Sequence, residues 1–258
     1  MEKPPAPRRF VIYFTPRSGS SWLADALTDS KCLGRPSEYF NPNFIPNIAR
    51  SINADSLERY IDVLTRRNHP GRIFSFEITI YHLNRVFGNG EAFLEFFPPS
   101  LPAFYLRRED MVLQAVSLAK AVTTSVYHSK NAQPQDINEA DTAFGYDPDL
   151  IGQWLAHILD QERKIEAYFE KFDLRPHRLS YEQIMEMGQE ATVRHFIRHL
   201  RPKMHQQGRP ANLTFSSRHA KIGTSRNAEY AERFRQDRPD RAAEVDEFRA
   251  SLAGTIAG

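Results

Sequence analysis

A short apolar run that leads directly into small, hydroxylated residues constrains the fold more than any other feature of the sequence. Residues 10–14 read Phe-Val-Ile-Tyr-Phe, and Thr-Pro-Arg-Ser-Gly-Ser-Ser follows at 15–21, before an apolar-periodic segment begins. A strand that is apolar throughout is typical of a parallel sheet covered on both faces. The pattern therefore predicts a buried strand, a tight loop and a helix, in that order.

The predicted loop carries donors suited to an anion. N–H groups at the start of a helix have no intrahelical acceptor and lie at the positive end of the helix dipole. Arg17 adds a positive charge with forked geometry. Capping of the helix by Ser18 is the purely structural alternative, but a cap needs neither the arginine nor three hydroxyls. The residues expected to donate to a phosphate or sulfate are Ser18, Gly19, Ser20 and Ser21.

The rest of the chain alternates between strand-like and helical patterns. Strand candidates occur at 73–80, 103–106 and 177–179, and the clearest helical stripe runs over 149–172. This alternation predicts an α/β fold, with a P-loop-like parallel β-sheet flanked by helices on both faces, as a single domain over residues 1–258. Residues 129–146 are polar and aperiodic, which predicts a lid or acceptor-contacting loop, with a plain flexible loop as the alternative.

Composition excludes several classes of protein. Cys32 is the only cysteine, so an intrachain disulfide and a cysteine-rich zinc site are excluded. No apolar run approaches the roughly 20 residues of a membrane span. The apolar run at 10–14 is too short for a signal-peptide core. We therefore expect a cytoplasmic protein without an integral membrane segment.

Positive charge is concentrated near the C-terminus. The chain has 34 Lys and Arg against 32 Asp and Glu, but residues 194–241 carry 12 basic against 4 acidic side chains. Such a segment favours a polyanionic small ligand over nucleic acid, and a solvated helix face is the structural alternative.

Four blocks of sequence, in order, resemble one enzyme family. Residues 15–23 (Thr-Pro-Arg-Ser-Gly-Ser-Ser-Trp-Leu) resemble the 5′-phosphosulfate loop of sulfotransferases that use 3′-phosphoadenosine 5′-phosphosulfate (PAPS), and residues 34–40 (Gly-Arg-Pro-Ser-Glu-Tyr-Phe) resemble a stretch of the bacterial trehalose 2-sulfotransferase family. Residues 106–118 and 225–234 are similar to two further blocks of that family. The resemblance implies a sulfotransferase fold, PAPS as the sulfuryl donor and a homodimer.

The resemblance also implies roles for individual residues. Glu38 matches the family's general base, which would take the proton of the acceptor hydroxyl, and a surface glutamate is the alternative. Arg108 and Ser117 match the 3′-phosphate site, and the adjacent Arg107 can substitute for Arg108. A surface ion pair of Arg108 with a neighbouring acid remains open. Arg226 lies in the fourth block and is expected to bind the nucleotide.

Other positions are less specific. Lys221 and Gly223 are expected either to close over the nucleotide or to form an ordinary basic helix entry. Tyr181 and Glu182 are expected to be structural or close to the adenosine. Where the family often has a lysine, this chain has Glu77, so the resemblance does not identify the acceptor.

Together these features predict in-line transfer of the sulfuryl group of PAPS to a hydroxyl of a carbohydrate, glycolipid or other small acceptor, without a metal. Arg17 would stabilise the charge that develops during transfer. Two alternatives stay open. One is a nucleotide-dependent kinase or phosphotransferase, which the missing Lys of the Walker pattern argues against. The other is a non-catalytic nucleotide-binding module.

Overall fold

The computed structural model describes residues 4–67, 69–126, 134–200 and 225–256. Lys221, Gly223 and residues 129–133 lie outside the described residues. The chain divides into two compact units, one formed by Met1–Arg107 and Lys164–Ser217 and the other by Arg108–Arg163 and Arg218–Gly258. The single domain expected from the sequence stays a prediction.

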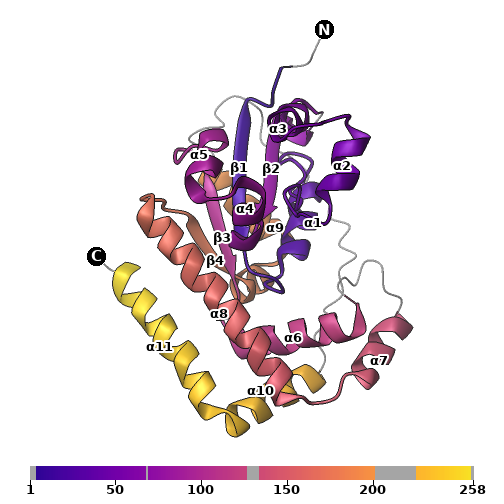
Figure 1. Ribbon diagram of the computed structural model, residues 1–258, viewed down its shortest axis with the longest axis vertical. Coiled ribbons are helices and arrows are strands. Elements are labelled where there is room, and N and C mark those ends of the chain that lie inside the picture. The colour runs from indigo at the N-terminus through magenta and orange to yellow at the C-terminus, as the bar shows by residue number, and fades with distance from the viewer. Residues whose placement is uncertain (1–3, 68, 127–133, 201–224, 257–258) are drawn as a thin grey trace. The chain divides into compact units, whose positions relative to one another are not determined.

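A four-stranded parallel sheet forms the centre of the first unit (Figure 1). Its strands lie in the order β2-β1-β3-β4. In the register Phe14 pairs with Leu106, and Arg107 pairs with Ser180, so the carboxyl ends of β1, β3 and β4 share one edge. The strands are β1 (Arg8–Phe14), β2 (Ile73–Ile78), β3 (Ala103–Arg107) and β4 (His177–Ser180). All four strands expected from the sequence are present, and β2 ends two residues early because the helix after it begins at Ile80.

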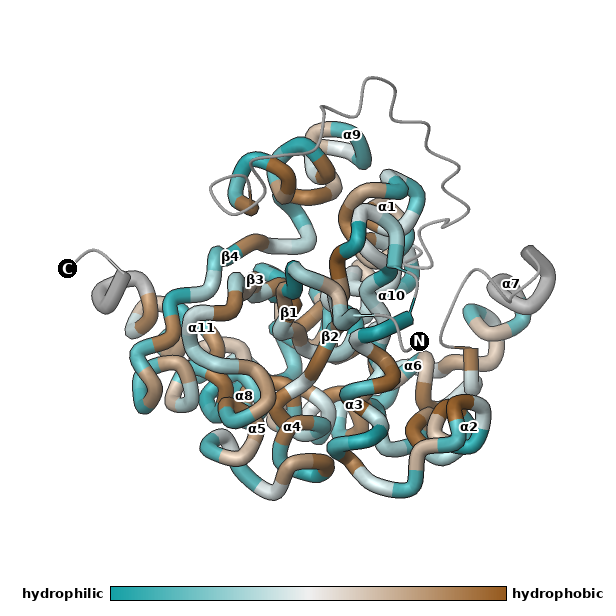
Figure 2. The backbone as a smooth tube through the Cα atoms, turned by 90° about the horizontal axis from the view of Figure 1, so that it is seen from above, coloured by the Kyte–Doolittle hydropathy of each residue, from teal (hydrophilic) through white to brown (hydrophobic). Residues whose placement is uncertain are grey.

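Helices cover both faces of this sheet, as the apolar strands require. Val11 and Tyr13 of β1 belong to one core cluster, whereas Phe10, Ile12 and Phe14 belong to another on the opposite face. Figure 2 shows the apolar residues of β1 and β2 in brown. The helical elements of this unit are α1 (Ser20–Asp29), α2 (Ile45–Ser51), α3 (Leu57–Arg66), the 3₁₀ turn Pro70–Arg72, α4 (Ile80–Phe87), α5 (Gly90–Phe96), α9 (Tyr181–Leu200) and the end of α8 (Pro148–Lys171). The expected α/β class and helix-flanked parallel sheet are therefore confirmed.

The second unit is helical and has its own core. That core contains Val116, Ile151, Leu155 and Phe234, and α10 packs on α6. The helices are α6 (Met111–Thr124), α7 (Pro134–Ala143), the first part of α8, α10 (Ser225–Asp237) and α11 (Pro239–Ile256). No helix among the described residues combines the length and the apolar character that crossing a bilayer requires.

The prediction of an irregular loop over residues 129–146 is wrong for residues 134–143, because these residues form the helix α7. Proline is well tolerated in the first turn of a helix, and Pro134 begins this one. Ala140 is buried, and the carboxylate of Asp141 accepts a hydrogen bond from Lys120 Nζ at 2.6 Å. These contacts stabilise α7, a polar helix whose sequence has too few apolar residues to show a helical period of hydrophobicity.

Candidate functional site

The loop between β1 and α1 turns through two residues with positive φ. Arg17 has φ 67° and Gly19 has φ 86°. The N–H of Ser18 donates to the carbonyl oxygen of Thr15 at 3.3 Å, which closes the turn. Positive φ at a non-glycine residue costs free energy, and such strain clusters at functional sites. The expected strand, loop and helix are therefore present, with Ser20 and Ser21 as the first residues of α1.

Ser18 is the least exposed residue of this loop. Its side chain is 0% exposed, and its Oγ has no hydrogen-bond partner among the described residues. A buried hydroxyl without a partner costs roughly 1–3 kcal/mol. An anion at the start of α1, where N–H groups lack intrahelical acceptors, would satisfy this hydroxyl. The residues present therefore fit a phosphate or sulfate group.

Tyr181 lies against the same loop. A Cβ added at Gly19 would stand 2.5 Å from Cδ2 of Tyr181, closer than any real contact. Gly19 is the N-cap residue of α1, and at this position no side chain caps the helix with a hydrogen bond. The ring of Tyr181 therefore supports the loop backbone, which is the structural role that the sequence left open for it.

Glu38 lies in a partly buried polar group with Asn41 and His82. Its Oε2 accepts a hydrogen bond from Nδ2 of Asn41 at 2.8 Å, and Nδ1 of His82 lies 3.8 Å away. Burial raises the pKa of Glu38 above its ordinary value, and the bond from Asn41 opposes that rise. Burial lowers the pKa of His82 to about 4, so the histidine is neutral near neutral pH and the 3.8 Å contact is not an ion pair there.

A second carboxyl, Glu77, stands close to this group. It lies at the end of β2, is 3% exposed, and its Oε1 has no hydrogen-bond partner among the described residues. Its backbone N–H donates to the carbonyl oxygen of Ser37 at 3.0 Å, which fixes the segment that carries Glu38. Burial raises the pKa of Glu77 well above its ordinary value, and the charges of Glu38 and Asp25 raise it further. Glu77 is therefore a buried carboxyl that favours its neutral form.

Arg107 ends β3 at the edge of the sheet from which the anion loop leaves β1. Its Nη1 is buried and has no hydrogen-bond partner among the described residues. A buried guanidinium N–H without an acceptor is costly, as the Ser18 hydroxyl is. Arg107, which the sequence offers only as a substitute for Arg108, thus has an unsatisfied donor at this edge.

The remaining expected residues lie in the second unit. The carbonyl oxygen of Arg108 accepts a hydrogen bond from Nη2 of Arg249 at 2.8 Å. Ser117 lies on α6 and is 9% exposed. Nη1 of Arg226, at the start of α10, donates to the carbonyl oxygen of Asp141. The carboxylate of Asp141 also binds Lys120, which follows Ser117 on α6, so Arg226 and Ser117 lie near the same group of polar side chains.

The structure therefore divides the expected residues into two sets. Arg17, Ser18, Gly19, Ser20, Ser21, Glu38 and Arg107 belong to the first unit, and Arg108, Ser117 and Arg226 belong to the second. Sequence reasoning missed Asn41, His82 and Lys120. His82 carried one usable signal, because it closely follows a predicted strand, at the edge where parallel sheets bind ligands.

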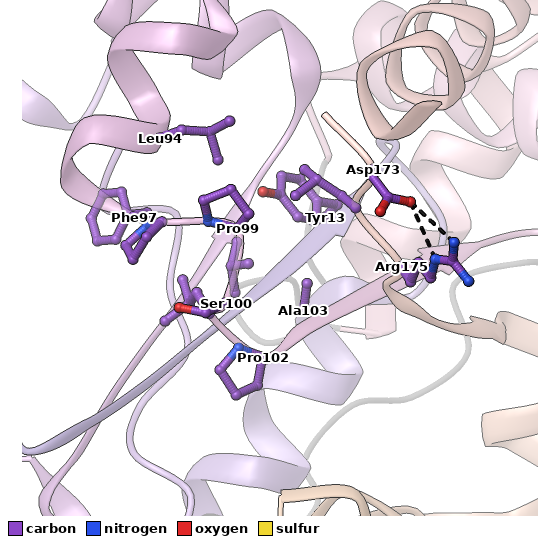
Figure 3. Close-up of a pocket in the computed structure, with 13 residues that line it drawn as sticks. Tyr13, Leu94, Phe97, Pro99, Ser100, Pro102, Ala103, Asp173 and Arg175 are labelled. Carbon is purple, nitrogen blue, oxygen red and sulfur yellow. Dashed lines mark hydrogen bonds and ion pairs between the residues drawn. The ribbon is translucent and has the colours of Figure 1, made fainter. Parts of the chain in front are cut away.

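A cavity of about 340 Å³ lies elsewhere in the first unit, and Figure 3 shows its lining. Leu94, Phe97 and Pro99 line it together with Ala103, the first residue of β3. Its charged pair, Asp173 and Arg175, is exposed, with more than four-fifths of each side chain open to solvent. None of the expected site residues lines this cavity.

Comparison with known proteins bears on the family. No curated protein matches the chain. A family model described as Stf0 sulphotransferase matches residues 100–237, which include Arg107, Arg108, Ser117 and Arg226. The matched segment is more than half of the chain and contains two of the four blocks that the sequence offers for this family. The chain therefore belongs to the Stf0 sulphotransferase family and is a sulfotransferase.

Proposed function

We propose that the chain transfers the sulfuryl group of PAPS to a hydroxyl of a carbohydrate, glycolipid or other small acceptor. One observation carries the proposal: the hydroxyl of Ser18, directly before the first turn of α1, is buried and has no hydrogen-bond partner among the described residues. That hydroxyl and the N–H groups of the helix start suit the oxygens of a phosphosulfate. The family supports sulfuryl transfer, and the loop chemistry supports an anionic donor.

The loop residues would act mainly by position and charge. In-line transfer of a sulfuryl group, like that of a phosphoryl group, spreads negative charge over the transferred group and the leaving oxygen. Arg17 supplies a fixed positive charge, and the hydroxyls of Ser20 and Ser21 supply further donors. One preorganised donor at such a site is worth about 3 kcal/mol of activation free energy.

Glu38 is the proposed general base. The acceptor oxygen attacks sulfur and forms the new S–O bond, while the S–O bond to the 5′-phosphate breaks and its electron pair stays with that phosphate. The proton of the acceptor hydroxyl goes to the carboxylate of Glu38. Its hydrogen bond from Asn41 holds Oε2 in place, and its partial burial makes the carboxylate a stronger base.

The 3′-phosphate is assigned to Arg108 and Ser117, with the adjacent Arg107 as a substitute for Arg108, and Arg226 is assigned to the nucleotide. Arg107 is supported by its buried Nη1, which finds no acceptor in the part of the chain that the structure describes. Arg108, Ser117 and Arg226 are supported by the family match that contains them. Arginine is suited to this role because its forked donors match phosphate oxygens.

The test compares ligands by the thermal stabilisation that they produce. At about 100 times its dissociation constant, a ligand adds roughly 2.7 kcal/mol to the free energy of unfolding. We expect 3′-phosphoadenosine 5′-phosphate to stabilise the protein more than 5′-AMP or ATP with Mg²⁺. The stabilisation should fall in Arg107→Ala or Arg108→Ala. Stabilisation by ATP alone would favour the kinase alternative and contradict the proposal.

A second measurement separates binding from chemistry. Glu38→Gln is expected to keep the affinity for 3′-phosphoadenosine 5′-phosphate and to lose sulfuryl transfer from PAPS to a panel of hydroxyl acceptors. Transfer at the unaltered rate in this variant would remove Glu38 as the base. Nucleotide binding without transfer in the unaltered protein, over the whole panel, would favour a binding module.

A further inference from the structure

Three histidines converge where β4 begins and α9 ends. His177 is the first residue of β4, and His195 and His199 lie in the last part of α9. One nitrogen from each ring can be chosen so that all three lie within 4.8 Å of one another. Nε2 of His177 lies 2.6 Å from Nε2 of His195, and the rings of His177 and His199 have centroids 3.5 Å apart.

The backbone holds the three rings on rigid elements. Residues four apart on a helix lie on the same face, so His195 and His199 project side by side from α9. Phe196 stacks on Phe104 of β3 with ring centroids 4.0 Å apart, which fixes α9 over the sheet. His177 pairs in register with Phe104, so the strand histidine sits on the same support. A binding site built on helices and strands is held more precisely than one built on loops.

We propose that His177, His195 and His199 form a site for one divalent transition-metal ion, of the zinc, nickel or cobalt class. Imidazole nitrogen is a ligand that these ions share, whereas Mg²⁺ and Ca²⁺ require oxygen ligands. The three chosen ligand atoms include no oxygen, so hard cations are excluded. His199 is exposed, which leaves room for water to complete the coordination.

The distances fit an ion after small movements of the rings. Nitrogen ligands lie about 2.0–2.1 Å from zinc, so two of them on a tetrahedral ion stand about 3.3 Å apart. The 2.6 Å contact between His177 and His195 must widen by less than an ångström, and the outermost pair must close from at most 4.8 Å. Rotation about the side-chain bonds of His199 provides this, because its ring is exposed.

Among the described residues, Arg198 acts on His195 together with His199, and its positive charge opposes binding of a cation without occupying a ligand position.

The site lies at the opposite end of β4 from the edge used for sulfuryl transfer. His177 begins the strand, whereas Ser180, which pairs with Arg107, ends it. An ion at the histidines would join the start of β4 to the end of α9 and would stabilise the fold rather than the reaction. The proposed metal site therefore does not depend on the proposed sulfotransferase function.

The test uses the untagged full-length protein, because a histidine tag would itself bind the ion. After removal of bound metal with a chelator, Zn²⁺ is titrated and the stoichiometry and dissociation constant are measured, with Co²⁺ absorption as a spectroscopic check of nitrogen ligation. We expect one ion per chain and a rise in the melting temperature that Mg²⁺ does not produce. His199→Ala and His195→Gln should each weaken binding roughly tenfold or more.

His157→Ala is the matched control, because His157 is bonded to Gln161 on α8 and is not part of the cluster. It should bind Zn²⁺ as the unaltered protein does. The melting temperatures of all metal-free variants are compared, and His199→Ala should keep the unaltered value because its side chain is exposed. The proposal would be overturned if the unaltered protein bound no Zn²⁺. It would also be overturned if His199→Ala and His195→Gln bound Zn²⁺ with the same affinity as the unaltered protein.

Discussion

The ring of Tyr181 occupies the space that a side chain at Gly19 would need. A Cβ at Gly19 would come within 2.5 Å of Cδ2 and 3.1 Å of Cε2 of that ring. Tyr181 begins α9, which follows β4, whereas Gly19 caps α1, which follows β1. Two segments far apart in the sequence thus fix the backbone that is proposed to bind the 5′-phosphosulfate.

Gly19→Ala is therefore expected to damage both stability and nucleotide binding. Alanine at positive φ costs about 1–2 kcal/mol, and the contact with Tyr181 adds to that cost. Gly88→Ala is a control for a positive φ without a side-chain contact, because Gly88 has φ 85° and ψ −43° and no atom within 4 Å of an added Cβ, whereas Gly19 has φ 86° and ψ 13°. Urea denaturation should show a loss of stability in both variants, and only Gly19→Ala should lose affinity for 3′-phosphoadenosine 5′-phosphate. Unchanged stability and affinity in Gly19→Ala would contradict the role given to Tyr181.

Ser18→Ala should separate stability from binding. Because Oγ of Ser18 is buried and has no partner within the described ranges, its removal is expected to leave the free energy of unfolding unchanged or to raise it by about 1 kcal/mol. Affinity for 3′-phosphoadenosine 5′-phosphate should fall. The control is Ser30→Ala, since buried Ser30 bonds to the carbonyl of Leu27 and the N–H of Cys32 and should lose about 1 kcal/mol of stability without losing affinity. A large loss of stability in Ser18→Ala would show that its hydroxyl has a structural partner.

Three strands, β1, β2 and β3, could be predicted from the sequence because each contains an apolar run, whereas β4 (His177–Ser180) contains a single apolar residue, Leu179. Residues 10–14 lie within β1, and the helical stripe at 149–172 matches α8 to within one residue at each end. The helix α7 could not be predicted, because its stability comes from contacts of Ala140 and Asp141 with other elements rather than from an apolar period. The division into two units has no local signal either, since it cuts through the continuous helix α8.

The anion loop could be predicted because all its donors are consecutive in the sequence. The other surroundings of Glu38 could not, because Glu77 and His82 are far from Glu38 in the sequence and approach it only in the fold. Glu77, which stands where the family often has a lysine, is a buried carboxyl whose raised pKa favours the neutral form. The homodimer and the cytoplasmic location stay predictions.

The acid limb of the pH–rate profile should report the pKa of Glu38. A base acts only when deprotonated, so kcat/KM is expected to rise with pH through a value above the ordinary 4.5 of a glutamate. Asn41→Ala removes the hydrogen bond that lowers this pKa, and the acid limb should therefore move to higher pH. His82→Ala should leave the limb near its original position, because a neutral imidazole contributes no charge. A shift to lower pH in Asn41→Ala would contradict the assigned base.

Glu77→Gln should flatten the pH dependence of stability. The folded protein holds the proton of Glu77 at pH values where the unfolded chain has lost it, so the free energy of unfolding falls as pH rises through that window. Each unit of pKa difference corresponds to about 1.4 kcal/mol. Glutamine keeps the shape and cannot ionise, so chemical denaturation from about pH 5 to about pH 9 should show a smaller decline than in the unaltered protein. The exposed Glu95 provides the control, since Glu95→Gln should keep the original slope. An undiminished decline in Glu77→Gln would mean that another group loses its proton in this range and that Glu77 is already charged in the folded protein.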